Sequence, residues 1–203
     1  MVSMEFITKF DQTLSVQNLD FVPPTWLDYL LRNATYLGDS RLMILLIPLL
    51  GLYLQRTNGW RTALIFVLGT SAACLTCETL KNCVGRNRPE VTQMRLEGIK
   101  VPTSPSFPSG HTFSASALYP GLAFIMARFS SSPALKVALP LFGTVLALLV
   151  GYTRIYLGVH FFSDVIAGLL GGFIFALAMA WLIPKAPAPT PDTKIDEPSS
   201  LLT

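Results

Sequence analysis

Long apolar runs separated by short polar stretches dominate this chain. A helix needs about 20 predominantly apolar residues, within a range of about 17–25, to cross the hydrocarbon core of a bilayer. The stretch 41–56 has a somewhat shorter apolar run, and four others meet the requirement: 62–80, 112–129, 135–152 and 162–183. The pattern predicts an all-α fold, a polytopic transmembrane helical bundle with five to six spans.

Residues 1–40 follow a different pattern. In 24–37, Asp28 and Arg32 interrupt an apolar face, which is typical of a helix that lies in the membrane interface, and 4–16 reads the same way. We therefore expect N-terminal amphipathic, interfacial helices over 1–40 and a transmembrane core over 41–184. The tail 185–203 is rich in Pro, Ser and Thr and has no aromatic residue, so we expect it to be disordered.

Composition agrees with a membrane protein. Hydrophobic residues make up 51% of the 203 residues, charged residues only 13%, and soluble domains carry about 25% charged residues. With three cysteines, the chain is also no disulfide-rich secreted scaffold. The formal net charge is only +3, but between residues 40 and 184 eleven basic residues face four acidic ones. This excess suits an anionic ligand or anionic lipid, although positive flanks are usual for membrane helices.

Alternation of five spans predicts which connections share a side of the bilayer. The connections 81–111 and 153–161 fall on one side, and the turns 57–61 and 130–134 fall on the other, with the tail. Basic residues stand near the helix ends of that second side, with no acidic residue nearby: Arg56, Arg61, Arg128, Lys136 and Lys185. Because cytoplasmic loops are enriched in Lys and Arg, the second side is expected to be cytoplasmic, and 81–111 faces outward.

Both histidines of the chain fall in the connections assigned to the outward side. His111 follows Ser109 and Gly110, where a Ser N-cap, a close backbone approach and a helix N-terminus together favour phosphate binding. His160 and Asp164 are four residues apart and share a helix face, so Asp164 can orient the imidazole of His160 as a nucleophile or base.

Three basic residues flank these histidines in the sequence. Lys81 supplies a compact charge, whereas the guanidinium groups of Arg88 and Arg154 match two phosphate oxygens. Pro89 disfavours helix at Arg88, so that side chain can turn back toward the site. We interpret these residues as a phosphate pocket, and the alternative is that the charges snorkel at helix ends.

A metal site and a nucleotide loop are both disfavoured. Only two histidines are present, and Cys74 and Cys77 lie inside a span with no second pair to complete tetrahedral ligation. No glycine-rich loop of the nucleotide-binding kind occurs, and Gly168, Gly171 and Gly172 are interpreted as close helix contacts. We expect no metal and no cofactor.

Three segments of the chain resemble the signature of the type 2 phosphatidic acid phosphatase family. They are Lys81-x6-Arg88-Pro89, Pro108-Ser109-Gly110-His111 and Thr153-Arg154-x5-His160-x3-Asp164, in the order and spacing of that family. The family usually has Ser where this chain has Thr153, and the hydroxyl is retained.

This resemblance implies a membrane helical bundle that is a metal-independent phosphatase working through a phosphohistidine. On this basis His160 attacks phosphorus, Asp164 orients His160, and His111 protonates the leaving oxygen and then activates water. The phosphoryl oxygens would be held by five residues of the same segments: Lys81, Arg88, Arg154, Ser109 and the amide of Gly110. Phosphoryl transfer depends mostly on positioning and charge stabilisation, which agrees with this set.

An embedded site that opens outward favours a lipid whose phosphate lies at headgroup level. The candidates are undecaprenyl diphosphate, phosphatidylglycerophosphate and phosphatidic acid, and the small chain and the outward site favour the first. The alternatives are a lipid A phosphatase or phosphotransferase with the same site, and a catalytically silent lipid-binding or transport protein. The expected partners are this lipid and the surrounding membrane lipids, without nucleic acid, in a bacterial inner membrane with the site on the extracytoplasmic side.

Overall fold

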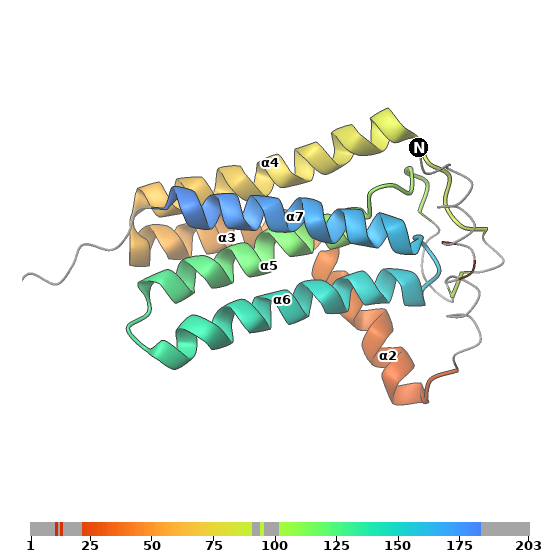
Figure 1. Ribbon diagram of the computed structural model, residues 1–203, viewed down its shortest axis with the longest axis horizontal. Helices are drawn as coiled ribbons and strands as arrows, with labels where there is room; N and C mark the ends of the chain where they lie inside the picture. Colours follow the sequence, from red (N-terminus) through yellow and green to blue (C-terminus); the bar gives the residue numbers. More distant parts are fainter. Residues whose placement is uncertain (1–10, 12, 14–21, 91–93, 96–101, 184–203) are drawn as a thin grey trace, which may run out of the picture.

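All regular structure in the described part of the chain is helical. The structure, a computed structural model, describes residues 11, 13, 22–90, 94–95 and 102–183. Its elements are α2 (Thr25–Ala34), the 3-10 helix η1 (Thr35–Gly38), α3 (Ser40–Asn58), α4 (Trp60–Val84), α5 (Gly110–Phe129), α6 (Pro133–Tyr156) and α7 (Phe162–Leu182). The all-α prediction is confirmed, and α3 to α7 run side by side as a bundle (Figure 1).

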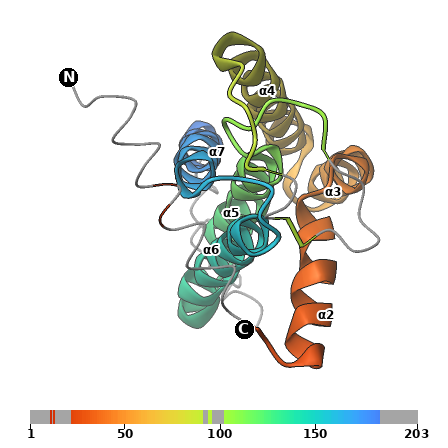
Figure 2. The same cartoon turned by 90° about the vertical axis from the view of Figure 1, so that its right-hand side faces the viewer.

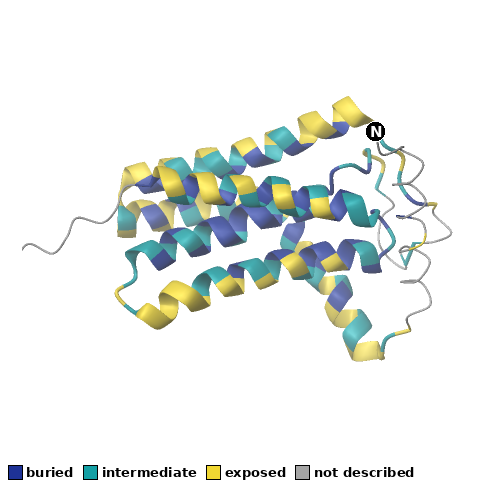
Figure 3. Cartoon of the chain, in the orientation of Figure 1, coloured by how far each residue is buried: buried dark blue, intermediate teal, exposed yellow. Residues whose placement is uncertain are grey.

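Helix α5 lies at the centre of this bundle. It contacts α3, α4, α6 and α7, and the end-on view of Figure 2 shows it among them. Most of its residues are buried, as the dark stretch of Figure 3 shows. Close packing depends on small residues: a Cβ on Gly172 would lie 2.3 Å from the carbonyl oxygen of Phe113, and one on Gly168 would lie 2.9 Å from that of Ser109. The interpretation of the α7 glycines as close contacts is confirmed.

The predicted number of spans is not confirmed. Three helices of the described residues are long and apolar enough to cross a membrane, namely α4, α6 and α7. A fourth is possible if α3 and the segment Thr25–Gly38, which meet at a bend of 58°, form one broken span. Helix α5 falls short because its small and polar side chains face neighbouring helices rather than lipid, so it needs less hydropathy than an outer helix.

The segment expected as an interfacial helix, 24–37, is helical. Helix α2 leaves the bundle at a steep angle (Figure 1) and exposes Trp26 and Tyr29, whereas Leu31 is buried. Its Asp28 carboxylate accepts hydrogen bonds from the Arg32 Nε at 2.8 Å and from the hydroxyl of Tyr156, so α2 is tied to α6. The predicted segment 4–16, apart from residues 11 and 13, and the predicted tail lie outside the described residues.

Both long connections lie at one end of the bundle. The link from α4 to α5 and the link from α6 to α7 meet there, and the turns after α3 and α5 lie at the opposite end (Figure 1). Segments that are far apart in the sequence, at 81–90, 102–111 and 154–164, therefore come together.

Candidate active site

Helix α4 brings Lys81 to the end where the connections meet. The helix ends at Gly85, whose φ of 61° is left-handed and whose N–H donates to the Lys81 carbonyl at 2.9 Å. The Lys81 side chain is buried and its Nζ donates to the Pro105 carbonyl at 2.8 Å. This bond holds the segment 102–107, which leads into Pro-Ser-Gly-His, against the end of α4.

Arg88 ties that segment to the loop after α6. Its Nε donates to the Ser104 carbonyl and its Nη1 to the Val159 carbonyl, both at 2.8 Å. Nη1 also lies 3.0 Å from Nε2 of His160. The guanidinium of Arg88 is therefore fixed beside the imidazole that the sequence singles out, as a fork of donors suited to phosphate oxygens.

His160 and Asp164 lie on the same face at the start of α7. Nδ1 of His160 is 3.4 Å from Oδ2 of the buried Asp164, and the same oxygen accepts from the Ser106 hydroxyl at 2.5 Å and from the Phe161 N–H at 3.0 Å. An acceptor at Nδ1 places the imidazole proton there and leaves the lone pair on Nε2, beside Arg88.

Burial keeps the His160 imidazole neutral. It lowers the pKa of His160 from 6.5 to about 3, although the hydrogen bond to Asp164 acts in the opposite direction. A charged imidazole would lose its hydration here and would also face the cations Arg154 and Arg88. At neutral pH Nε2 is therefore unprotonated, which a nucleophile requires.

Arg154, in the last turn of α6, is a buried cation with a donor to spare. Its Nη1 donates to the hydroxyl of Thr35 on η1. Its Nε is buried and has no hydrogen-bond partner among the described residues. Buried donors in proteins are almost always paired, so this N–H is suited to an oxygen of a bound ligand.

The first turn of α5 carries His111. Nε2 of His111 lies 3.9 Å from a carboxylate oxygen of Asp39, the N-cap residue of α3. Ser109 occupies the N-cap position of α5 as the sequence predicts, but its hydroxyl pairs with that of Thr112 at 2.9 Å instead of capping the helix.

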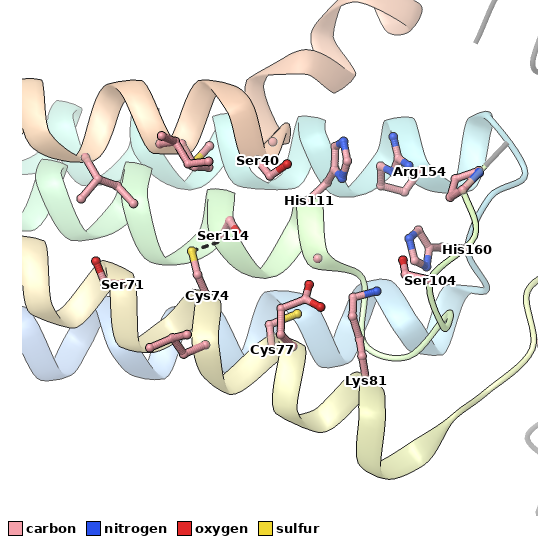
Figure 4. Close-up of a pocket in the computed structure, with 18 of the residues that line it drawn as sticks. Ser40, Ser71, Cys74, Cys77, Lys81, Ser104, His111, Ser114, Arg154 and His160 are labelled. Atoms are coloured by element: carbon pink, nitrogen blue, oxygen red, sulfur yellow. Dashed lines mark hydrogen bonds between the residues drawn. The ribbon is translucent and has the colours of Figure 1, made fainter. Parts of the chain in front are cut away.

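One cavity, of about 710 Å³, brings most of the predicted residues together. The predicted site residues on its wall are Lys81, Arg88, Gly110, His111, Arg154 and His160. Asp164 and Ser109 are not on the wall: Asp164 lies behind His160, and Ser109 is buried against Thr112. Figure 4 shows Lys81, Arg154 and the two histidines at one end of this cavity and Ser71 at the other.

The other end of the cavity lies between α3 and α4 and is mainly apolar. Its walls include Ile47, Pro48 and Val67, and the exposed side chains of Ile44 and Leu75 place this part at the bundle surface. The cavity thus connects a basic end to an apolar one that meets the hydrophobic exterior.

Sequence reasoning missed a second layer of polar residues behind His160. Arg86 donates to Asp164 and to Asp11, at 2.7 Å in each case, and stacks on the Phe161 ring with its Cζ 4.2 Å from the centroid. Asp11 also accepts from the N–H and the hydroxyl of Ser163, at 2.9 and 2.6 Å. Arg86 stands inside the first motif, which is a usable signal, whereas nothing in the pattern around Asp11 marks it.

Two other details differ from a simple reading of the motifs. The Thr153 hydroxyl bonds to the Val150 carbonyl at 2.7 Å within α6, so it does not face the cavity. Arg95, part of the basic outward connection, stacks on Tyr156 rather than joining the phosphate pocket, with its Cζ 4.7 Å from the ring centroid.

No group of three or more His, Cys, Asp or Glu side chains that could hold a metal occurs among the residues the structure describes.

Comparison with known proteins agrees with this geometry. The family model of the PAP2 superfamily matches residues 61–188. Phosphatidylglycerophosphatase B of Bacillus subtilis is 33% identical over 163 residues, which cover 78% of this chain and 74% of that protein. A lipid A 1-phosphatase of Rhizobium johnstonii is 33% identical over 111 residues, which cover 52% of this chain and 41% of that protein.

Solved structures show the same architecture. The PAP2-type phosphatidylglycerolphosphate phosphatase of Bacillus subtilis superposes with a TM-score of 0.77 at 27% identity, covering 88% of this chain and 86% of that one. LpxE of Aquifex aeolicus superposes with a TM-score of 0.60 at 24% identity and covers 85% of this chain and 93% of its own, which shows a shared fold.

Proposed function

The chain belongs to the PAP2 superfamily and is an integral membrane lipid phosphatase, and we propose that it removes the terminal phosphate of a glycerophospholipid through a phosphohistidine on His160. The family model covers residues 61–188, which contain all three motifs. The proposal for the roles of individual residues is supported by the geometry around the cavity.

The observation that carries the lipid assignment is the cavity itself. One end has Lys81, Arg88 and Arg154, and the other end is apolar and reaches the outer surface between α3 and α4. A lipid phosphate has the same two parts, an anionic headgroup and an apolar chain. Its phosphate therefore fits the basic end while its chain lies against α3 and α4.

In the first step, Nε2 of His160 attacks phosphorus and the bond to the leaving oxygen breaks. His111 gives a proton to that oxygen, so the lipid leaves as a neutral alcohol. The charge on the phosphoryl oxygens is stabilised by the three cations, and the Nε–H of Arg154 that lacks a partner among the described residues is available for one of them.

In the second step, water attacks the phosphorus bound to His160. His111, now neutral, takes a proton from this water, and the bond between Nε2 and phosphorus breaks to release inorganic phosphate. Asp164, whose Oδ2 lies 3.4 Å from Nδ1 of His160, keeps the proton on that nitrogen and stabilises the positive charge of the ring during both steps.

Phosphatidylglycerophosphate is the leading substrate. The sequence alone favours undecaprenyl diphosphate, because the chain is small and the site faces outward. We prefer phosphatidylglycerophosphate because the Bacillus subtilis relative, whose match covers 78% of this chain, carries the name phosphatidylglycerophosphatase B. The similarity to a lipid A 1-phosphatase supports lipid A as a second candidate, over a smaller part of the chain.

The site lies on the extracytoplasmic side of a bacterial cell membrane in this proposal. Exposed Arg56, Arg61 and Lys136 stand at the opposite end of the bundle, which the positive-inside tendency makes cytoplasmic. Helix α2 lies at the level of the site and exposes Trp26 and Tyr29, so residues 22–40 would lie along the outer interface.

Phosphate release from detergent-solubilised lipids tests the proposal. The purified protein is assayed with phosphatidylglycerophosphate, phosphatidic acid, undecaprenyl diphosphate and lipid A, and His160→Ala serves as the inactive control. We expect the highest kcat/KM with phosphatidylglycerophosphate and no turnover by the variant. Binding of these lipids without any release by the wild type would instead indicate a silent lipid-binding protein.

A further inference from the structure

Asp39 stands at the break between η1 and α3, directly beside the first turn of α5. It is the N-cap of α3, where its Oδ1 accepts from the N–H of Arg41 at 2.8 Å. Its other oxygen, Oδ2, lies 3.9 Å from Nε2 of His111. The two oxygens thus have different partners, and the cap alone does not account for the second contact.

The backbone is built to bring this corner close to His111. A Cβ on Gly38 would lie 2.8 Å from both the Cβ and the carbonyl oxygen of His111, so only glycine permits the approach. The Tyr119 hydroxyl, on α5, donates to the Leu37 carbonyl at 2.7 Å and fixes η1 on the same helix. The position of Asp39 relative to His111 is therefore held by packing and a hydrogen bond.

The surroundings of His111 oppose the protonated imidazole that a general acid requires. It shares the cavity wall with Lys81, Arg88 and Arg154, and each of these cations opposes a protonated imidazole. Among the residues that the structure describes, Asp39 is the carboxylate with an oxygen within 4.0 Å of a His111 ring nitrogen, at 3.9 Å. Asp39 does not line the cavity, so it stands behind the ring, as Asp164 stands behind His160.

We propose that Asp39 is a positioning residue for His111, whose carboxylate stabilises the imidazolium that protonates the leaving oxygen. The inference rests on the proposed function and adds a second carboxylate–imidazole pair to the site, supplied from outside the part of the chain matched by the family model. The 3.9 Å between Oδ2 of Asp39 and Nε2 of His111 is longer than a hydrogen bond, and catalytic contacts of this kind shorten when substrate binds. Asp39 stays ionised throughout, while the proton passes from His111 to the ester oxygen as the P–O bond breaks.

Leaving-group dependence separates this role from a structural one. The wild type and Asp39→Asn are compared with dodecyl phosphate, whose alkoxide must be protonated, and with a dodecyl-substituted nitrophenyl phosphate, whose leaving group departs without a proton. Asn is as good an N-cap as Asp, so α3 is retained. The quantity compared is kcat/KM, which reports the steps up to release of the leaving group.

We expect Asp39→Asn to lower kcat/KM for dodecyl phosphate by about tenfold or more, and that for the nitrophenyl ester by less than about threefold. His111→Ala should show the same selectivity, and Asp39→Asn should add little to it in the double variant. Asp28→Asn, which removes a carboxylate from α2, should leave the ratio of the two values unchanged.

An equal loss on both esters, or no loss on either, would overturn the role of Asp39. Failure of the wild type to hydrolyse either ester or any lipid phosphate would instead be a failure of the proposed function. If Asp39→Asn does not yield folded protein, Asp39→Ser, which also caps a helix, is measured in its place and judged by the same ratio.

Discussion

Arg86 and Asp164 form an ion pair with a distance of 2.7 Å between Nη1 and Oδ1, in which the carboxylate is fully buried. The second oxygen of Asp164 remains for Ser106, the Phe161 N–H and His160. The other terminal nitrogen of Arg86 binds Asp11, so one guanidinium holds two carboxylates apart and in place. Arg86 is not on the cavity wall, and it influences the reaction through the orientation of Asp164 and His160.

Arg86→Lys should therefore lower kcat and leave KM nearly unchanged. Lysine retains the charge but lacks the planar fork that bridges two carboxylates, so Asp164 shifts relative to His160. A small misplacement of catalytic groups is costly, and we expect kcat to fall about tenfold to a hundredfold. Steady-state kinetics with phosphatidylglycerophosphate in detergent measures both constants.

The matched control is Arg61→Lys, at the exposed start of α4 and far from the site, which should behave as the wild type. A kcat near that of the wild type for Arg86→Lys would show that the ion pair has no part in orienting His160. A rise confined to KM would place Arg86 in substrate binding instead.

The two histidines should differ in whether a phosphoenzyme forms. With radiolabelled lipid phosphate and a rapid alkaline quench, which preserves phosphohistidine, the wild type should retain label on the protein and His160→Ala should retain none. With an activated nitrophenyl ester, His111→Ala should retain more label than the wild type. The phosphohistidine forms because this leaving group needs no proton from His111, and it then persists because the variant has no base to activate water.

Label on His160→Ala equal to that on the wild type would exclude His160 as the nucleophile. Label absent from every variant, together with normal phosphate release, would favour direct attack by water. Circular dichroism and gel filtration check that each variant is folded, so that a loss of label reflects the reaction. We expect both variants to fold, since neither histidine contributes to the hydrophobic clusters of the bundle.

The helices and the site residues on the cavity wall could be predicted from the sequence because both depend on local patterns, hydropathy for the helices and short motifs for the site residues. Hydropathy predicted the positions of α4, α6 and α7 to within a few residues. The span that it predicted over α5 is not confirmed, because α5 is buried among helices, where small residues such as Ala115 and Ala117 replace large apolar ones. The same residues make α5 less apolar than a lipid-facing helix.

The partners of the motif residues were not accessible in the same way. Asp11 and Asp39 reach Arg86 and His111 across 75 and 72 positions of the chain, and no periodicity relates such distant residues. Ser109 shows the converse limit: its place before α5 was predicted, whereas the direction of its hydroxyl depends on Thr112 and on packing. Rotamers and long-range pairs follow from tertiary structure rather than from spacing.

Burial of His160 should make stability depend on pH in a defined window. Its pKa is about 3 in the folded protein and 6.5 when unfolded, so between these values the unfolded chain binds a proton that the folded one does not. This residue therefore lowers the free energy of unfolding as the pH falls below 6.5, by about 1.4 kcal/mol per pH unit. Glutamine does not titrate, and in His160→Gln this contribution is absent.

Thermal unfolding in detergent at pH 7.5, 6.5 and 5.5 checks this expectation. The midpoint of the wild type should fall more steeply below pH 6.5 than that of His160→Gln, whereas the two should run parallel above it. Parallel curves over the whole range would mean that folding does not lower the pKa of His160, contrary to burial of the neutral ring.

The apolar end of the cavity should determine which chain lengths are accepted. Ser71, on α4, lies on the cavity wall between Val67 and Cys74, and Phe at this position would fill space that an acyl chain occupies. Ser71→Phe should raise KM for dipalmitoyl phosphatidic acid by about tenfold, since each buried CH₂ contributes about 0.8 kcal/mol and two suffice for this loss. It should leave KM for the dihexanoyl lipid within about twofold, because a short chain does not reach that depth. Leu68→Phe, on the exposed face of the same helix, is the matched control and should change neither value. Equal effects of Ser71→Phe on both lipids would mean that the chain leaves the site by another route.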